Sequence, residues 1–555
     1  MASRAELHLN DNPIGVPTVA DVEAFRSIAE VFDQSVATFR DRTAYINMGQ
    51  GITYGELDRL SRRFGAYLQS RVGLIKGARV ALMMPNVLQY PVALFGALRI
   101  GCTVVNCNPL YSPRELEHQL IDSGAEAIVV LENFAHVLAE VVDRTRLREI
   151  ITTGLGDLLG FPKRTVVNFV VRYVKRMVPA WNLPGSVSFS TVLRKGGSLP
   201  WRAVETNRDD IAFLQYTGGT TGVPKGAMLT NGNVVANMQQ GHAWLKPVLS
   251  DRIETIVTAL PLYHIFALTA NCLTYLKIGA TNLLITNPRD IPGFVKELSK
   301  YRFTTLTGVN TLFNALLNHP DFAKLDFSSL NLSLGGGMAV QRSVAERWKA
   351  VTGKPLIEAY GMTEASPCIT MNPLDITEFT GSIGLPFPNT EIAIRDDVGS
   401  DVAAGMPGEL CVRGPQVMKG YWNNPEETAA VMTPDGFLRT GDIARIDDDG
   451  YVHIVDRKKD MIIVSGFNVF PTEIEEVLAC HPGVLESGAV GVPDLRSGEA
   501  VKVVVVKRDT NLTAEDLLEH CRHNLTGYKM PRFVEFRNEL PKTNVGKVLR
   551  RALRD

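Results

Sequence analysis

A glycine- and threonine-rich stretch, residues 216–226, carries the clearest chemical pattern in this sequence. It reads Tyr-Thr-Gly-Gly-Thr-Thr-Gly-Val-Pro-Lys-Gly and follows Ile211–Leu214, an apolar run typical of a buried strand. Glycines let backbone N–H groups approach an anion, hydroxyl groups add donors, and Lys225 adds a positive charge. The Gly-Lys-Ser/Thr ending of a Walker A loop is missing. The pattern therefore indicates a phosphate-binding loop of another kind, with a flexible surface loop as the alternative.

Two more strings and one carboxylate combine residue types that are common in binding sites. A second glycine turn, Gly335–Gly337, lies upstream of Tyr360–Glu364, which combines an aromatic ring, a hydroxyl and a carboxylate. Asp442 follows a Thr-Gly pair. Hydroxyl and carboxylate oxygens are the ligands that Mg²⁺ prefers. A lone carboxylate is more often a solvated side chain, and Thr-Gly-Asp is a common turn, so each pattern alone is weak evidence.

Basic residues toward the C-terminus form a third group. Arg457 and Lys459 lie in the charged run Asp456–Asp460, between two apolar stretches, and Lys547 lies close to the last residue. A lysine carries a compact charge that can neutralise a reacting anion. The alternative is a solvated basic tail, because two arginines follow Lys547 and chain ends are often disordered.

These strings, in this order, resemble the signature motifs of the adenylate-forming superfamily, which includes acyl-CoA synthetases, luciferases and the adenylation domains of peptide synthetases. The resemblance covers nearly the whole chain. It implies that ATP and AMP contact the following residues: Tyr216, Thr217, Gly218, Gly219, Thr220, Thr221, Gly222, Lys225, Gly335, Gly336, Gly337, Tyr360, Gly361, Thr363, Glu364, Asp442 and Arg457.

The resemblance also implies a role for several of these side chains. Thr217 and Glu364 would hold Mg²⁺, and Thr363 would touch the α-phosphate. Tyr360 would pack against adenine, and Asp442 would accept hydrogen bonds from the ribose hydroxyls.

Two lysines match positions with special roles in the family. Lys547 resembles the catalytic lysine, and the catalytic set implied is Lys547, Thr217 and Glu364. Lys459 matches the hinge about which a small C-terminal domain swings. Arg457 resembles a second ribose contact. A lysine on a mobile domain can reach the reacting groups at one stage and withdraw at the next.

The acyl substrate is implied by a narrower resemblance. Residues 435–460 look like the fatty-acyl-CoA synthetase signature, and residues 210–555 resemble bacterial long-chain fatty-acid–CoA ligases. His264 matches a position beside the acyl pocket, with a satisfied core histidine as the alternative. Some long-chain members carry a tryptophan gate where this sequence has Leu268. The resemblance therefore implies a substrate pocket at His264 and Leu268, with gating that differs from those members.

The implied reaction has two steps and three substrates. A fatty-acid carboxylate attacks the α-phosphorus of ATP to give acyl-adenylate and pyrophosphate, and the thiol of CoA then displaces AMP, feeding fatty-acid degradation or lipid synthesis. One rival is a superfamily enzyme that acts on aryl or medium-chain acids or stops at the adenylate. Another is a catalytically silent, nucleotide-dependent membrane protein that binds fatty acid. A homodimer is a further expectation from the family.

Composition narrows the functional classes. The chain has 555 residues, 45% of them hydrophobic, and a net charge of −1, so no global field would recruit nucleic acid. The seven cysteines are scattered without a Cys-x-x-Cys pair, which favours reduced thiols over zinc or disulfides. We expect neither a signal peptide nor a transmembrane helix. The expected location is cytoplasmic, with peripheral association at the cytoplasmic face of the inner membrane.

Hydrophobic patterning predicts an α/β fold. Apolar strands at 79–84, 103–106 and 127–131 alternate with helices at 90–100 and 113–123, a rhythm typical of parallel βαβ sheets. Short strands with turns indicate an antiparallel β subdomain over 381–455. We therefore predict an N-terminal domain at 1–455, a hinge linker at 456–460 and a mobile α+β domain at 461–555.

Residues 166–178 interrupt this rhythm. Asn168, Arg172, Lys175 and Arg176 have a spacing that places them on one face of a helix whose other positions are apolar. Such a basic amphipathic helix is suited to lie on a membrane surface. The alternatives are a helix packed on the core with its arginines in water, and a strand, which the many valines permit.

Overall fold

Four β-sheets organise the chain in the computed structural model, which describes residues 17–217, 224–249, 252–465, 467–494, 496–543 and 546–554. The first has seven strands in the order β7-β6-β5-β3-β4-β8-β9, all parallel except β9. These strands are β3 (Arg79–Met83), β4 (Thr103–Asn106), β5 (Ala127–Leu131), β6 (Glu149–Thr153), β7 (Val187–Ser188), β8 (Ile211–Thr217) and β9 (Lys225–Thr230).

The second sheet has nine strands in the order β16-β15-β14-β13-β12-β10-β11-β1-β2. They are β1 (Thr43–Asn47), β2 (Gln50–Thr53), β10 (Thr255–Thr258), β11 (Thr281–Leu284), β12 (Thr305–Gly308), β13 (Leu332–Gly336), β14 (Leu356–Gly361), β15 (Cys368–Met371) and β16 (Leu385–Pro386). Its central strands are parallel, and the strands are short apolar runs because helices cover them. The predicted βαβ architecture is confirmed.

The other two sheets are mainly antiparallel. The third consists of β17 (Glu391–Arg395), β18 (Gly408–Arg413), β19 (Leu438–Ile446) and β20 (Val452–Arg457). The fourth consists of β21 (Ile462–Val464), β22 (Phe467–Val469), β23 (Val484–Asp494), β24 (Gly498–Lys507) and β25 (Phe533–Arg537). With α14 (Pro471–Ala479) and α15 (Ala514–Asn524), the fourth sheet encloses its own apolar core. We call residues 461–555 the small domain.

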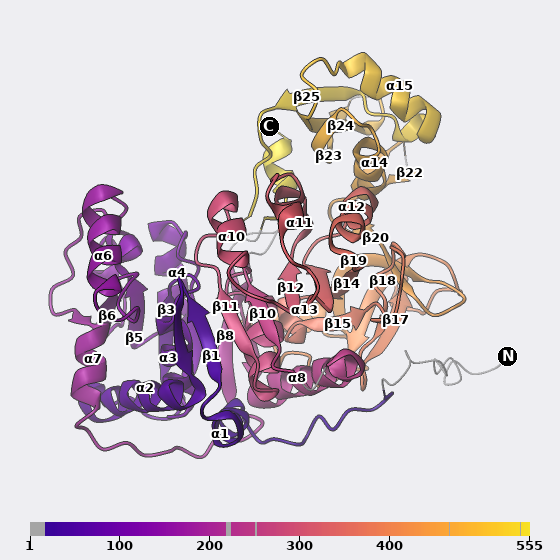
Figure 1. The fold of residues 1–555 in the computed structure, drawn as a ribbon. Coiled ribbons are helices and arrows are strands. Elements are labelled where there is room, and N and C mark those ends of the chain that lie inside the picture. The colour runs from indigo at the N-terminus through magenta and orange to yellow at the C-terminus, as the bar shows by residue number, and fades with distance from the viewer. Residues whose placement is uncertain are drawn as a thin grey trace.

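Helices cover the two parallel sheets, and one continuous apolar core joins them. Figure 1 shows the seven-stranded sheet among indigo and purple helices, the nine-stranded sheet beside it, and the small domain (yellow) above. These helices are α1 (Ile28–Phe39), α2 (Tyr54–Tyr67), α3 (Gln89–Leu98), α4 (Pro113–Ser123), α5 (Ala135–Ala139), α7 (Phe189–Gly196), α8 (Asn231–Leu245), α9 (Tyr275–Lys277), α10 (Ile291–Leu298), α11 (Asn310–Leu317), α12 (Arg342–Thr352) and α13 (Pro425–Val431).

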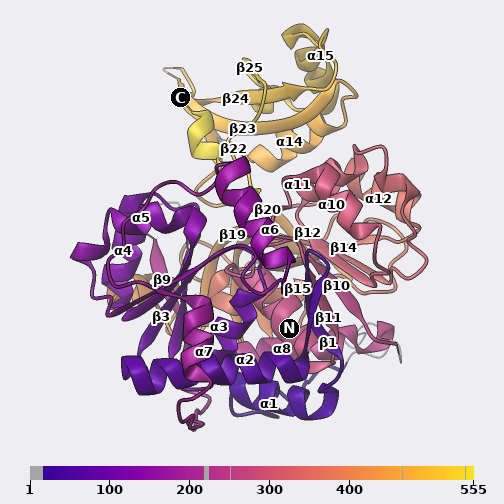
Figure 2. The same ribbon diagram turned by 60° about the vertical axis from the view of Figure 1, so that its left-hand side comes forward.

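The charged run predicted as the linker belongs partly to a strand. Asp456 and Arg457 are the last residues of β20, and Asp456 is buried. The connection to β21 is therefore the short turn that contains Lys458–Asp460. Figure 2 shows the small domain above the rest of the chain in the rotated view.

The segment that interrupts the βαβ rhythm is helical. α6 (Lys163–Phe169) continues directly into a π-helical turn, η5 (Val170–Val174), and both lie beside β6 at the outer edge of the molecule in Figure 1. The alternative of a strand is wrong. Within the described part of the chain, we find no helix with the length and apolar content needed to cross a bilayer.

The polar residues of this segment do not form the predicted exposed face. Asn168 donates to Asp157 Oδ1 at 3.0 Å, and Arg172 forms an ion pair with Glu132. Both contacts turn these side chains toward the protein, because their acidic partners lie on the body of the seven-stranded sheet. Only Lys175 and Arg176, of the four residues predicted, are exposed.

Apolar side chains take the outer face instead. We define this apolar face as Phe161, Val166, Phe169, Tyr173, Val174 and Met177. Each of them is more than half exposed, and Phe161 is 90% exposed. The rings of Phe169 and Tyr173 lie against each other with their centroids 5.2 Å apart. Large exposed apolar patches mark interaction sites more often than single exposed residues do.

Candidate active site

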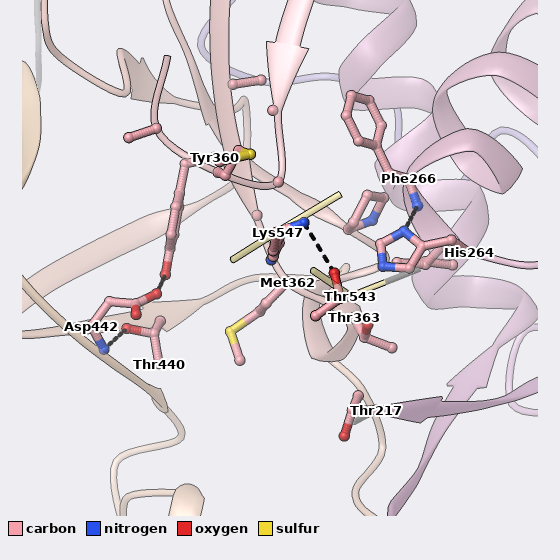
Figure 3. A pocket seen from close by; sticks show the side chains of 18 of the residues that line it. Thr217, His264, Phe266, Tyr360, Met362, Thr363, Thr440, Asp442, Thr543 and Lys547 are labelled. Atoms are coloured by element: carbon pink, nitrogen blue, oxygen red, sulfur yellow. Dashed lines mark hydrogen bonds between the residues drawn. The ribbon is translucent and has the colours of Figure 1, made fainter. Parts of the chain in front are cut away.

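One cavity of about 1850 Å³ brings the chemically suggestive residues together. Both parallel sheets, the antiparallel sheet and the small domain contribute to its walls, and Figure 3 shows part of its lining. The sequence-predicted residues that line it are Tyr216, Thr217, Lys225, His264, Gly336, Gly337, Tyr360, Gly361, Thr363, Glu364, Asp442, Arg457, Lys459 and Lys547. Gly335 and Leu268 lie behind this lining, and Gly218, Gly219, Thr220, Thr221 and Gly222 lie outside the described residues.

The hairpin β8–β9 positions the predicted phosphate loop. Thr217 is the last residue of β8 and pairs in register with Lys225, the first residue of β9. The Lys225 ammonium forms an ion pair with Glu427 and lies over the ring of Tyr421, 5.2 Å from its centroid. The hairpin therefore holds a hydroxyl and a cation at one end of the cavity, where an anion would meet both.

Tyr216 has a different environment from the one predicted for a nucleotide contact. Its hydroxyl donates to Asp122 Oδ2 on α4, and its ring meets His118 edge-on. The side chain is 7% exposed, so it fixes β8 against α4 as well as lining the cavity. The predicted contact between Tyr216 and ATP stays a prediction.

Glu364 is a buried carboxylate with a single well-defined donor. It lies in the 3₁₀ turn η9 (Thr363–Ala365), and its Oε1 accepts a hydrogen bond from Tyr421 at 2.8 Å. Burial raises the pKa of Glu364, while the Tyr421 hydrogen bond and the nearby Lys225 lower it. A bound cation would favour the ionised form further. The group therefore suits a metal or another positive ligand on its free side.

Two positions in the predicted nucleotide-binding motifs, Gly361 and Gly337, require glycine because of their backbone geometry and surroundings. A β-carbon at Gly361 would lie 2.1 Å from the carbonyl oxygen of Pro367, so no side chain fits there. Gly337 has a φ of +78°, which disfavours other residues. These positions keep β13 and β14 close to the cavity wall at the strand ends that carry Tyr360.

Tyr360, Asp442 and Arg457 form a linked trio. Tyr360 donates to Asp442 Oδ2 at 2.6 Å, and Arg457 lies 3.3 Å from Asp442 Oδ1. Asp442 and Arg457 are also register partners across β19 and β20. Burial and Asp442 raise the pKa of Tyr360 well above its usual value, so the phenol stays a donor. The trio offers a buried carboxylate suited to two hydroxyl groups.

Lys547 enters the cavity from the small domain. Its backbone N–H donates to Thr543 Oγ1 at 3.1 Å, which closes a tight turn, and Thr311 of α11 donates to the carbonyl of Gly546. Figure 3 shows the lysine between Tyr360 and His264 in this view. Burial, and then the charge of Arg457, lower the pKa of Lys547 to about 8. The ammonium form still predominates at neutral pH.

His264 is neutral at neutral pH. Burial, and then the nearby Lys547 charge, lower its pKa to about 4. Its Nδ1 lies 3.4 Å from the backbone nitrogen of Phe266. Leu268 is fully buried in the large apolar core, on the π-helix η7 (Ala267–Thr274), whereas its neighbours Thr269 and Ala270 line the cavity. The assignment of Leu268 to the substrate pocket stays a prediction.

Lys459 also faces the cavity, and burial lowers its pKa to about 8. Next to it lies a buried ionic cluster that the sequence did not indicate. Arg550 contacts Asp456 at 3.0 Å, Asp460 at 3.3 Å and Glu475 at 2.8 Å. The cluster joins the last residues of the small domain to the strand before the turn at Lys459.

Sequence reasoning missed the residues that fix the predicted ones. Tyr421 and Glu427 hold Glu364 and Lys225, and Arg550 was interpreted only as part of a solvated tail. Tyr421 lies in a Tyr-Trp-Asn-Asn-Pro stretch without a recognisable motif. Such partners are set by the tertiary structure, so no local pattern could have revealed them.

Comparison with known proteins places these observations in context. Residues 32–422 match the AMP-binding enzyme family, and residues 473–547 match the AMP-binding enzyme C-terminal domain. The chain is 60% identical to a long-chain-fatty-acid–CoA ligase of Yersinia pestis, covering 98% of this chain and 96% of that protein. It is 58% identical to one of Salmonella typhimurium, covering 99% and 97%. The solved anthranilate–CoA ligase AuaEII with anthranoyl-AMP is similar, with a TM-score of 0.84, 26% identity and coverage of 96% and 97%.

Proposed function

The chain belongs to the AMP-binding enzyme family, and we propose that it is an ATP-dependent long-chain fatty-acid–CoA ligase. It joins a fatty acid to CoA through an acyl-adenylate and releases pyrophosphate and AMP. One observation carries the proposal: the Lys547 ammonium from the small domain lies in the same cavity as Asp442 and Glu364. This arrangement provides a charge for the reacting anions, a carboxylate for ribose and a carboxylate for a metal.

The first step brings two anions together, so the site must supply positive charge. The fatty-acid carboxylate attacks the α-phosphorus of ATP, and pyrophosphate leaves. Lys547 stabilises the charge that develops between them, and Lys225 at the hairpin end attracts the outer phosphates. Tyr360 and Arg457 hold Asp442 in place for the ribose hydroxyls. Preorganised charges in a buried site act without reorganisation at the moment of reaction.

The second step requires Lys547 to give way. The thiol of CoA attacks the acyl carbon of the adenylate, and AMP leaves. In the present arrangement Thr543 and residues 547–550 of the small domain line the cavity. Rotation about the turn that contains Lys459 would withdraw Lys547 and present another face of the small domain. Domain movements of this kind are a known gating step in enzymes.

Mg²⁺ is expected to accompany ATP at Glu364 and Thr217. The donor set fits, because both residues offer hard oxygen atoms at the cavity wall and Mg²⁺ usually takes one or two protein ligands. Glu364 keeps one oxygen on Tyr421, which orients the carboxylate. The ion would neutralise phosphate charge. Phosphate oxygens and water would complete its shell.

The proposed activity is tested by two assays on one preparation. Pyrophosphate exchange into ATP should depend on added fatty acid, and CoA thioester should then form at the expense of the adenylate. Exchange with benzoate alone would favour an aryl-acid ligase. Exchange without thioester formation would favour an enzyme that stops at the adenylate. Neither reaction with any acid would contradict the proposal.

A peripheral contact with anionic membrane is part of the proposal. The apolar face defined above carries three aromatic rings, and the exposed Lys175 and Arg176 lie within the same segment. Aromatic rings favour the boundary between lipid headgroups and acyl chains, and basic residues favour an anionic surface. The substrate also partitions into membranes. The apolar face would therefore insert into the membrane surface, with Lys175 and Arg176 beside it. This differs from the predicted contact, which was through a basic face.

A further inference from the structure

The cavity extends beyond His264 as a channel between two helices and the nine-stranded sheet. The lining residues recur on one face of each helix, four residues apart. They are Asn237, Gly241 and Leu245 on α8, and Phe266 immediately before η7 with Ala270 and Thr274 on η7. Eight residues of α-helix rise by about 12 Å, so the α8 wall alone extends roughly that far.

The lining on α8, η7 and β12 to β15 is mostly apolar or uncharged. Glu358 of β14 is the exception; it is buried, and it accepts a hydrogen bond from the backbone N–H of Val340 at 2.9 Å. The opposite wall includes Leu332 and Leu334 of β13 and Met371 of β15. Leu245 and Tyr275 line the cavity at the C-terminal end of α8 and just after η7, and Tyr275 is held by a 2.8 Å hydrogen bond to Thr305. A mostly apolar lining suits an unbranched alkyl chain.

Gly241 lies midway along the channel and leaves it open. Of the described residues, only Thr274 has atoms within 4 Å of a β-carbon built at Gly241, at 3.8 and 3.9 Å. Both distances are ordinary van der Waals contacts, so a methyl group would fit. Atoms beyond the β-carbon would enter the space that the channel provides.

We propose that Gly241 sets the length of the acyl chain that the enzyme accepts. The missing side chain lets the alkyl chain pass Thr274 and reach Leu245 and Tyr275. A larger side chain would close the distal half of the channel, while the part beside His264 and Ala270 would remain. This inference rests on the proposed ligase function and names the residue that limits its substrate. Gly241 is a specificity-determining position and takes no part in the chemistry.

The test compares acids of different length on Gly241→Leu. Each methylene excluded from an apolar site lowers binding about fourfold, so displacing two or more should lower kcat/KM for palmitate by at least about tenfold. Hexanoate, which has a much shorter alkyl chain, should change by no more than about twofold. Gly241→Ala should behave like the parent enzyme. Gly241→Met provides a second blocking variant, because its flexible side chain adapts to the surrounding walls.

Ala243→Leu is the matched control. Ala243 is half-buried on the same helix, and two residues of α-helix place it on a different face from Gly241. Its substitution should not change the ratio of palmitate to hexanoate activity. Equal losses for both acids in Gly241→Leu and Gly241→Met, or unchanged palmitate activity, would overturn the inference. A parent enzyme that activates neither acid would instead contradict the proposed function.

Discussion

Lys547 of the small domain lies against Gly337 of the glycine turn, with its Cε 3.8 Å from the position of a β-carbon on that glycine. The contact joins two segments that are more than 200 residues apart in the sequence. In the proposed mechanism this is the arrangement that serves the adenylation step.

Lys547→Ala should separate the two half-reactions. Acyl-adenylate formation should fall by on the order of 10²–10³-fold, as for the loss of one preorganised transition-state donor. Thioester formation from a supplied acyl-adenylate should be largely spared, because the lysine has left the site by then. Lys459→Pro should do the converse, since proline fixes φ and stiffens the turn. If both variants lose both steps in equal proportion, alternation of the small domain is contradicted.

The adenylation rate should fall as the pH rises above neutrality. The pKa of Lys547 is lowered to about 8, so its charged fraction is nearly complete at pH 7 and falls about tenfold per pH unit above 8. Pyrophosphate exchange between pH 7 and 10 measures this decline. Lys547→Arg should remove it at a lower absolute rate, because arginine stays protonated. Lys459→Arg should keep the decline, which distinguishes Lys547 from Lys459, whose pKa is also lowered to about 8.

Glu364→Gln should raise the Mg²⁺ requirement of adenylation. The substitution keeps the shape and an acceptor for Tyr421 but removes the charge that binds the ion. Tyr421→Phe should raise it less, by about 10–100-fold, as expected for a residue that orients a metal ligand. A titration of exchange rate against Mg²⁺ on both variants provides the measurement. Identical Mg²⁺ dependence in Glu364→Gln and parent would remove Glu364 from the metal site.

Asp456→Asn should disfavour the present, adenylating arrangement of the small domain relative to the arrangement used for thioester formation. Asp456 is almost fully buried and accepts hydrogen bonds from Arg550 at 3.0 Å and from the backbone of Thr472 at 2.8 Å. Both donors belong to the small domain, whereas Asp456 precedes the turn. A hydrogen bond to a charged group contributes about 1.5–3 kcal/mol, so the ratio of thioester formation to adenylation should rise about tenfold or more. Asp460→Asn, which alters a residue of the turn itself, should shift the ratio less.

Vesicle binding should depend on the apolar face. Phe169→Ser combined with Tyr173→Ser should weaken co-sedimentation with vesicles that contain anionic phospholipid by at least tenfold, because an apolar side chain contributes about 1.5–3 kcal/mol on burial. Val398→Ser is the control, since Val398 is 85% exposed on another part of the chain. Lys175→Glu with Arg176→Glu should weaken binding mainly at low salt. Unchanged co-sedimentation of the aromatic variant would contradict the membrane contact.

Much of the site could be predicted because its motifs are local in the sequence. Thr217 is the last residue of β8 and Tyr360 lies near the end of β14, and the resemblance of their motifs to one family implied that both contact ATP. The alternation of apolar runs and amphipathic helices likewise indicated the βαβ sheets. Local chemistry and local periodicity are properties that a sequence displays directly.

Other features depend on partners far along the chain. β1 pairs with β11, more than 230 residues away, and no local pattern indicates this. A helix was predicted over 166–178, and the structure has one over 163–174. Its orientation was not predicted correctly, because that depends on Asp157 and Glu132. Amphipathic spacing tells which residues share a face and leaves open which face meets the protein.

The hydrogen bond from Tyr360 to Asp442 has a consequence for turnover. A buried carboxylate without partners would be unstable, and Tyr360 and Arg457 engage both oxygens of Asp442. In the proposed mechanism, ribose hydroxyls would gain only the difference between their own contacts with Asp442 and these two. AMP lacks the outer phosphates that help to hold ATP, so this small gain would favour its rapid departure.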